Sequence, residues 1–268
     1  MPIKWVVVSD GSTDGTDDIV RIYAANHLWI ELIRMPERPE RSFAGKVLAF
    51  NSGWERVKRL PWEIIGNLDA DVSFGNDHFE FLLAKFAGNP RLGVGGTPFT
   101  EGHGTYDFRF SSLEHVSGIC QLFRRECYES IGGYNPIKHG GVYLVAVITA
   151  RMKGWQTRTF PERVCFHHRK MGSGTNATFV LHFDWGQRDY RLGSHPLWEL
   201  FRCLYKAGKR PYILGGLLYL FGYLYALVTM RQRDVSDEFA AFRAKEQMFR
   251  LKNLFNSRIN LGADSPQS

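Results

Sequence analysis

Cysteine is scarce in this chain, and its spacing indicates no metal site. Only four cysteines occur among 268 residues, and none belongs to a Cys-x-x-Cys pair. Neither a zinc site nor a disulfide framework is therefore indicated. A secretory signal peptide is also lacking, since Met1 to Lys4 leads straight into a strand-like stretch. We expect a protein of a reducing cytoplasm. The cysteines are Cys120, Cys127, Cys165 and Cys203.

The chain has fewer acidic residues than basic residues. The chain has 34 lysines and arginines against 27 aspartates and glutamates, a formal net charge of +7. Such a balance suits a nucleotide diphosphate, a nucleic acid or an anionic bilayer. No basic patch interleaved with aromatic residues stands out, so a nucleic-acid partner is not expected. With 44% hydrophobic residues, the chain can bury one large core, or one core with an appendage.

The first part of the chain alternates strand-like and helix-like segments. Ile3 to Ser9 is β-branched and apolar, and a glycine-containing turn with acidic residues follows it. Further strands are expected at Leu28 to Arg34 and Glu63 to Asp69, with a helix at Gly45 to Lys58 between them. This pattern predicts an α/β domain at residues 1–192, with a mostly parallel sheet flanked by helices. Later strands are expected at Leu92 to Thr97 and Val164 to Phe166. Later helices are expected at Arg124 to Ile131 and Val142 to Lys153.

Residues 193–268 differ in character and predict a helical, membrane-associated region. The segment 211–230 holds no charged residue, and its length is about that needed to cross a bilayer. A buried helix or hairpin is the alternative. Basic residues flank both ends, so a helix or helical hairpin lying in the membrane interface is favoured over a simple span. At 236–255, phenylalanines interleaved with charges predict an amphipathic helix.

Two aspartates stand at the end of the strand that begins at Glu63. Residues i and i+2 of an extended segment point to one side, so Asp69 and Asp71 can face one site at the carboxyl end of the sheet. Two carboxylates there suit Mg²⁺ or Mn²⁺, which would bridge two phosphates and neutralise a leaving group. A solvated turn is the alternative, because such a short motif requires context.

Several other motifs supply that context. In chain order they are Val6-Val-Val-Ser-Asp-Gly-Ser-Thr-Asp-Gly-Thr16, Gly45-Lys46, Leu68-Asp-Ala-Asp71, Ile131-Gly-Gly-Tyr134, Gly154-Trp155 and His167-His-Arg169. As a set, from about Lys4 to Arg169, they resemble family 2 glycosyltransferases of the membrane-associated bacterial polysaccharide type. The resemblance implies a GT-A fold and the inverting transfer of a sugar from a nucleotide-diphosphate donor, a UDP-sugar in particular.

The resemblance also implies roles for individual residues. The donor-binding residues would be Asp10, Lys46, Asp69, Asp71, His168 and Arg169. Asp69 and Asp71 would serve the metal ion, while His168 and Arg169 would face the departing diphosphate. Judged without the family, Asp10 could cap a turn and Lys46 could be a solvated helix residue. Adjacent strand residues point opposite ways, so only one of His167 and His168 is expected to face the ligand.

Two features depart from the family's pattern. The opening strand that precedes Val6 to Ser9 in the family does not appear in this sequence. Either the sequence is a fragment, or its start is misplaced, or another segment takes the place of that strand. The acid expected shortly before Gly154-Trp155 is also lacking, because residues 138–147 contain no aspartate or glutamate. Tyr143 stands roughly at that position, but a phenol is a poor base near neutral pH. His139 is the nearest substitute for the catalytic base.

Taken together, these observations predict a metal-dependent glycosyltransferase at the cytoplasmic side of the cell membrane. Its acceptor would be a polysaccharide or a lipid-linked glycan. A non-catalytic paralogue that binds nucleotide-sugar or glycan is one alternative, supported by the missing acid. A nucleotidyltransferase is another, because such enzymes can share the sheet and the metal-binding aspartates, although the Gly-Gly-Tyr and Gly-Trp segments count against it.

Overall fold

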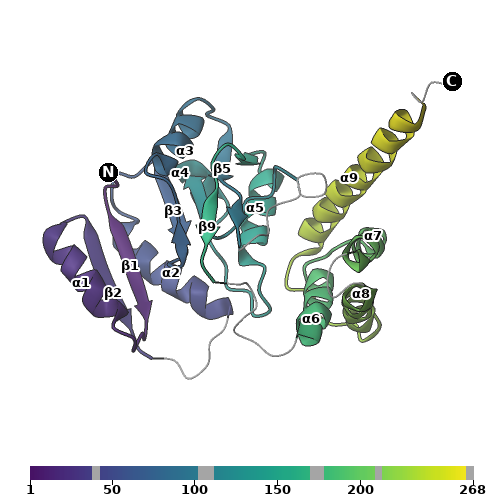
Figure 1. Cartoon of the computed structure of the whole chain (residues 1–268), viewed down its shortest axis with the longest axis horizontal. Helices are drawn as coiled ribbons and strands as arrows, with labels where there is room; N and C mark the ends of the chain where they lie inside the picture. The colour runs from purple at the N-terminus through teal and green to yellow at the C-terminus, as the bar shows by residue number, and fades with distance from the viewer. Residues whose placement is uncertain (38–42, 102–111, 170–177, 209–212, 264–268) are drawn as a thin grey trace. The chain divides into compact units, whose positions relative to one another are not determined.

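The chain forms two compact units (Figure 1). Unit 1 is Met1–Arg169 and unit 2 is Lys170–Ser268. The boundary therefore precedes the expected one at residue 192, because helix α6 (Thr178–Arg191) packs against the later helix α8 (Ile213–Val228). The structure is a computed structural model, and it describes residues 1–37, 43–101, 112–169, 178–208 and 213–263.

A pair of parallel strands opens unit 1. Strand β1 (Trp5–Asp10) pairs with β2 (Ile30–Met35), and helix α1 (Thr16–Asn26) connects them. Helix α2 (Phe43–Val57) packs on β1, and a β-carbon added at Gly53 would lie 3.2 Å from the Val8 side chain. The alternation of strands and helices expected for this part of the chain is confirmed.

The central sheet of unit 1 is mixed, in the order β3-β7-β5-β8. Strand β7 runs antiparallel to both β3 and β5, whereas β5 and β8 are parallel. The prediction of a mostly parallel sheet was therefore wrong, because β7 was not recognised as a strand and it runs against both neighbours. The strands are β3 (Ile64–Leu68), β5 (Leu92–Gly96), β7 (Cys120–Arg124) and β8 (Gln156–Thr159).

Three short strands form a third sheet in the order β4-β9-β6. Strand β9 runs antiparallel to β4 and parallel to β6. Apolar side chains from helix α3 (His78–Ala87) and from the strands form a buried cluster that includes Leu82, Phe86 and Leu92. Helices α4 and α5 complete the unit. The remaining bounds are β4 (Val72–Ser73), β6 (Phe99–Thr100), β9 (Cys165–His167), α4 (Arg125–Ser130) and α5 (Val142–Met152).

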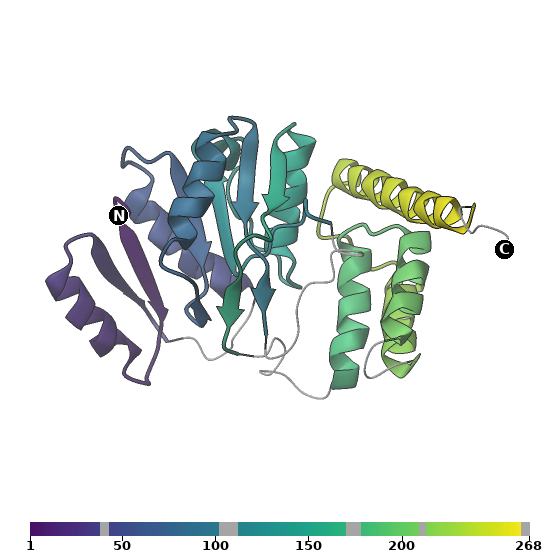
Figure 2. The ribbon, with the colours of Figure 1, turned by 45° about the horizontal axis from the view of Figure 1, so that its top comes forward.

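The strands of unit 1 are interrupted between β1 and β3. Among the described residues, β1 pairs only with β2 and β3 pairs only with β7. Helix α2 bridges the two parts, because the Trp54 ring packs 5.1 Å from Tyr128 of α4 while Gly53 lies against β1. Both ribbon views show β1 and β3 running in the same direction (Figures 1 and 2), so their carboxyl ends lie at the same end of the unit.

Unit 2 is built from four helices within the described residues. Helices α6 and α8 touch backbone to backbone: a β-carbon at Gly186 would lie 2.0 Å from the Tyr219 carbonyl oxygen, and one at Gly222 would lie 2.0 Å from that of Phe183. Only glycine permits this approach, which is typical of closely packed helices in membranes. The other helices are α7 (Pro196–Ala207) and α9 (Asp237–Ala263), the latter running past the expected end at residue 255.

The interior of unit 2 contains charged groups. The carboxylate of Asp189 accepts hydrogen bonds from Arg202 and Arg243, each at 2.8 Å. Burial opposes ionisation of Asp189, yet the nearby arginines hold its pKa far below the usual range. Glu199 is fully buried beside them, and burial, reinforced by Asp189, raises its pKa. These groups are structural, because they fasten α6, α7 and α9 together.

The outer face of α8 is apolar. Its side chains at Leu214, Leu217, Phe221, Leu224 and Val228 recur at helical spacing and are 43–78% exposed. The opposite face, which carries the glycines and Tyr219, is buried. Among the described residues, no helix combines the length and apolar character that crossing a bilayer requires.

Candidate active site

The two aspartates follow β3 and are fixed by backbone hydrogen bonds to different strands. The backbone amide of Asp69 donates to the Ile119 carbonyl at 2.9 Å, just before β7. The carbonyl of Asp71 accepts from the His168 amide at 2.9 Å, just after β9. Asp69 is therefore anchored to the central sheet and Asp71 to the third sheet, and the pair marks the junction of the two sheets.

Asp69 is paired with Lys46 from the first turn of α2. The Lys46 ammonium nitrogen lies 2.6 Å from each carboxylate oxygen of Asp69. Burial raises the pKa of Asp69, and the charge of Lys46 opposes that rise. Burial opposes the charge on Lys46, but Asp69 beside it raises the Lys46 pKa above its ordinary value. The structure thus brings together Lys46 and Asp69, 23 residues apart, as a close ion pair.

Tyr143 lies against this ion pair, where the sequence analysis expected an acid. The Lys46 ammonium nitrogen is 5.3 Å from the centre of its ring. A β-carbon at Gly118 would lie 2.1 Å from that ring, so glycine is required there. Burial raises the pKa of Tyr143, while Lys46 opposes the rise. Tyr143 therefore stays protonated near neutral pH and can donate a hydrogen bond, but it is no base.

The histidine that faces Asp71 is His167, not His168. The side chain of His167 is buried, with Nε2 at 3.4 Å from Asp71 Oδ1 and Nδ1 at 2.9 Å from Glu101 Oε1. His168 is exposed, and its Nε2 lies 3.0 Å from Ser73 Oγ. Strand alternation in β9 causes this difference. The predicted contact between His168 and the departing diphosphate stays a prediction, and His167 is an additional histidine beside Asp71.

Asp71, His167 and Glu101 form a chain that fits a divalent ion. Two ligands of one octahedral ion with bonds of about 2.1 Å lie about 3 Å apart, close to the observed separation of Asp71 and His167. Glu101 would hold the imidazole from behind, as carboxylates do for metal-bound histidines. Asp71 is also the more accessible aspartate, with 32% of its side chain exposed against 13% for Asp69.

The remaining predicted residues lie at different distances from this centre. Arg169 is 71% exposed, with its Nε 4.0 Å from Asp71 Oδ2. Asp10 ends β1, at the same end of unit 1 as Asp69. His139 is half-buried in a turn before α5, and its role as base stays a prediction.

The sequence-based prediction did not include Glu101 or His167 among the site residues. Glu101 follows a strand of only two residues, which leaves no periodic signal. His167 stood in a recognised motif, and knowledge of which face of β9 is buried would have selected it. A hollow of about 470 Å³ lies nearby, but none of these candidate residues lines it.

Comparison with known proteins identifies the family of this chain. The sequence model of the family described as glycosyl transferase family 2 matches residues 1–149. The chain is 24% identical over 147 residues to the poly-beta-1,6-N-acetyl-D-glucosamine synthase of Staphylococcus epidermidis. That match covers 47% of this chain but only 34% of the relative, so the chain spans about a third of the length of that protein.

Solved glycosyltransferases share the fold. The mannosyltransferase PcManGT of Pyrobaculum calidifontis, in complex with GDP-Man and Mn²⁺, has a TM-score of 0.52 and 20% identity, covering 97% of this chain and 74% of its own. GalNAc-T7 with UDP, GalNAc and Mn²⁺ has a TM-score of 0.52 and 12% identity, covering 91% of this chain and 48% of its own. At these identities the likeness establishes the α/β fold of GT-A glycosyltransferases.

Proposed function

This chain belongs to glycosyl transferase family 2, and from that premise we propose that it transfers a sugar from a nucleotide-diphosphate donor, a UDP-sugar, to a polysaccharide or lipid-linked acceptor. The observation that carries the proposal is the placement of Asp71 and His167 at the junction of two sheets, backed by Glu101. Acidic and imidazole ligands at that point suit a divalent ion and the diphosphate it would bind.

Asp71 and His167 would hold the ion, with Asp69 close by. A bound ion would neutralise the charge that develops on the departing nucleoside diphosphate. The mixed carboxylate and imidazole ligands favour Mn²⁺ over Mg²⁺, because magnesium prefers oxygen ligands. Lys46 neutralises Asp69, so that this carboxylate would not repel the diphosphate. Arg169, which is mostly exposed, is free to close over the phosphates as a bidentate donor.

Transfer with inversion needs a base for the acceptor hydroxyl. The raised pKa of Tyr143 removes it from consideration, and His139 in the preceding turn is the proposed base. Exchange of His139 for glutamine should lower kcat and leave nucleotide affinity unchanged. If transfer is unaffected, His139 is not the base. If sugar transfer appears only after Tyr143 is replaced by glutamate, the wild-type chain is the non-catalytic paralogue.

Unit 2 is proposed to place the enzyme on the cytoplasmic face of the cell membrane. The exposed apolar face of α8 would enter the interface between headgroups and acyl chains. Arg231 and Arg233 follow that helix directly and would contact anionic headgroups. The close α6–α8 contact at Gly186 and Gly222 supports this proposal, because such packing is common among membrane-embedded helices.

The decisive experiment is calorimetric titration of UDP, GDP and CMP with and without Mn²⁺. Binding of UDP that requires Mn²⁺ and is lost in Asp71→Asn supports the proposal. The matched control is Asp77→Asn, which removes an exposed carboxylate paired with Arg163 in the same unit. Absence of nucleotide binding by the folded wild-type chain would overturn the donor site. Release of pyrophosphate from a nucleoside triphosphate would instead identify a nucleotidyltransferase.

A further inference from the structure

Three side chains that can bind metals meet in the core of unit 1. They are His78, Cys120 and Cys165, each only 1% exposed. The two sulfurs and one imidazole nitrogen all lie within 4.8 Å of one another. Each residue is the first of its element, namely α3, β7 and β9, so the cluster joins three elements that are far apart in the sequence.

The separations of these atoms match those of ligands around one ion. His78 Nε2 lies 3.7 Å from Cys120 Sγ and 3.6 Å from Cys165 Sγ. An ion with bonds of about 2.3 Å to sulfur and about 2.0–2.1 Å to nitrogen, at tetrahedral or trigonal angles, places the ligand atoms about 3.6–3.8 Å apart. Both nitrogen–sulfur separations therefore fit an ion bound between the imidazole and each sulfur.

The imidazole of His78 has few polar contacts besides the two thiols. Its ring packs against Phe74 at 5.1 Å and Phe79 at 5.4 Å between ring centres. Its Nδ1 has no hydrogen-bond partner among the described residues, so the ring's polar contacts are with the two thiols. The Thr97 hydroxyl lies 3.3 Å from Cys165 Sγ and brings an oxygen to the edge of the cluster.

We propose that His78, Cys120 and Cys165 form a binding site for a thiophilic metal ion such as Zn²⁺, separate from the residues of the candidate active site. Two sulfurs and one imidazole are typical zinc ligands, and water or the Thr97 hydroxyl can take the fourth position. On binding of a divalent ion, both thiols lose their protons to solvent and form metal–sulfur bonds. Two protons are released for each ion bound, so affinity rises with pH.

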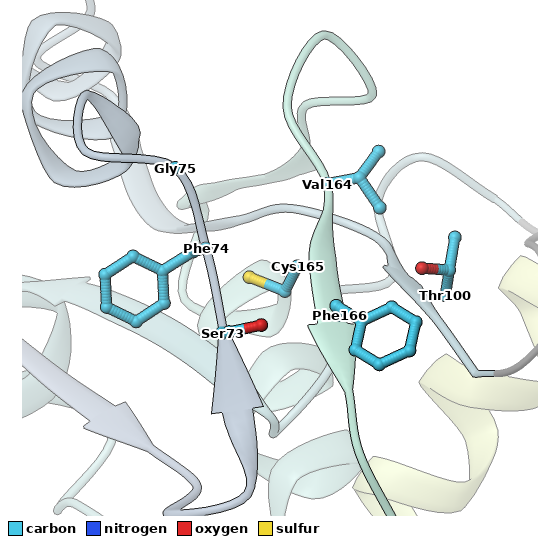
Figure 3. A pocket seen from close by; sticks show the side chains of 7 residues that line it. All are labelled: Ser73, Phe74, Gly75, Thr100, Val164, Cys165 and Phe166. Carbon is cyan, nitrogen blue, oxygen red and sulfur yellow. The ribbon is translucent and has the colours of Figure 1, made fainter.

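Such an ion would fasten β9 to β7 and α3. Cys165 and His167 are two residues apart on β9 and both are buried, so they point to the same side of the strand. Fixing Cys165 would therefore also fix the register that directs His167 toward Asp71. Figure 3 shows Cys165 among the residues that line a hollow at the sheet of β4, β9 and β6, together with Ser73 and Phe74. This hollow gives an ion a short route to the buried sulfur.

The test uses the full chain, stripped with a chelator under reducing conditions and titrated with Cd²⁺ as the probe. Ultraviolet absorption from thiolate-to-cadmium charge transfer should appear with one ion per chain. Zn²⁺ added to the stripped chain should raise Tm by about 5–10 °C at a free concentration of about 100 times Kd. Cys120→Ser and Cys165→Ser should each weaken binding by more than about 100-fold, beyond the loss expected for an outer-shell residue.

Two controls keep the test decisive if those variants fold poorly. Cys127→Ser removes another fully buried thiol of unit 1 and should bind cadmium like the wild type. The double variant C127S/C203S leaves Cys120 and Cys165 as the only cysteines, so its charge-transfer absorption must come from that pair. Absence of this absorption in the folded double variant overturns the proposal. Wild-type cadmium affinity in Cys165→Ser also overturns the proposal. The same holds if the chain binds no metal and readily forms a disulfide between Cys120 and Cys165.

Discussion

The two units place their charges in opposite ways. In unit 1 the interior is mainly apolar, and the partly exposed carboxylates of Asp71 and Glu101 gather beside strand ends. In unit 2 the charges of Asp189 and Arg243 are buried while apolar side chains cover the outside of α8. The difference teaches that a strongly shifted pKa does not by itself mark an active site. The largest shifts in unit 2 belong to groups that hold helices together.

The largest expected effect is on the folding of unit 2. Asp189→Asn should lower the free energy of unfolding by about 3–5 kcal/mol, because the buried guanidinium of Arg243 would lose its paired carboxylate. Urea unfolding of the full chain measures this change. An effect below 1 kcal/mol would mean that the buried charges are not structural, and the contrast between the units would fail.

The next effect separates two neighbouring histidines. His167→Ala should weaken Mn²⁺-dependent UDP binding on the order of 100-fold, because it removes a ligand and its link to Glu101. His168→Ala should weaken it less than His167→Ala does, since that side chain faces Ser73 and its removal would cost a diphosphate contact but no metal ligand. Calorimetry provides both numbers. The reverse order would show that His168, and not His167, supports the Mn²⁺-dependent binding of UDP.

A smaller effect is expected where two helices of unit 2 touch. Gly186→Ala should destabilise the protein by about 1–3 kcal/mol, because its new methyl group would collide with the Tyr219 carbonyl. The matched control is Gly208→Ala, where the nearest atom is 3.6 Å away. Thermal unfolding followed by circular dichroism compares the two. Equal stabilities would show that α6 and α8 are not in close contact.

Membrane binding provides a direct comparison of the two surfaces. Phe221→Ser on α8 should weaken partitioning onto anionic phospholipid vesicles about tenfold, through the loss of apolar contact with the bilayer. Ile22→Ser on α1 of unit 1 is the control, since both side chains are about 60% exposed, at 60% and 64%. Vesicle co-sedimentation measures both variants. If they lose binding equally, α8 is not the membrane-facing surface.

The smallest effect depends on pH. The pKa of Glu199 is raised in the folded protein, so its stabilising contribution is complete below its unfolded pKa of about 4.3 and disappears as pH rises through the folded pKa. Glu199→Gln should remove that decline and change stability by less than about 1 kcal/mol near pH 5. The pH dependence of the contribution from Asp189 has the opposite sign. Because the pKa of Asp189 is lowered in the folded protein, its stabilising contribution is lost only in strong acid. Urea unfolding at several pH values tests the difference.

Local patterns predicted most elements of unit 1 but not how they pair. Trp5–Asp10, Ile64–Leu68 and α2 follow from apolar runs and turn residues that lie next to one another in the chain. Strand β7 was missed, and with it the mixed character of the sheet. The direction of a strand relative to its neighbours depends on contacts across the sheet. The residues of one strand alone say little about those contacts.

The amino-acid sequence by itself determined the family, the Asp69 and Asp71 pair at a strand end, and the uncharged segment of unit 2, because each is a local pattern. Only the tertiary structure decided that His167 meets Glu101, 66 residues away, and that His78 joins two thiols lying 42 and 87 residues further along the chain. Such contacts depend on which faces of distant elements are buried together. No spacing within the sequence encodes that choice.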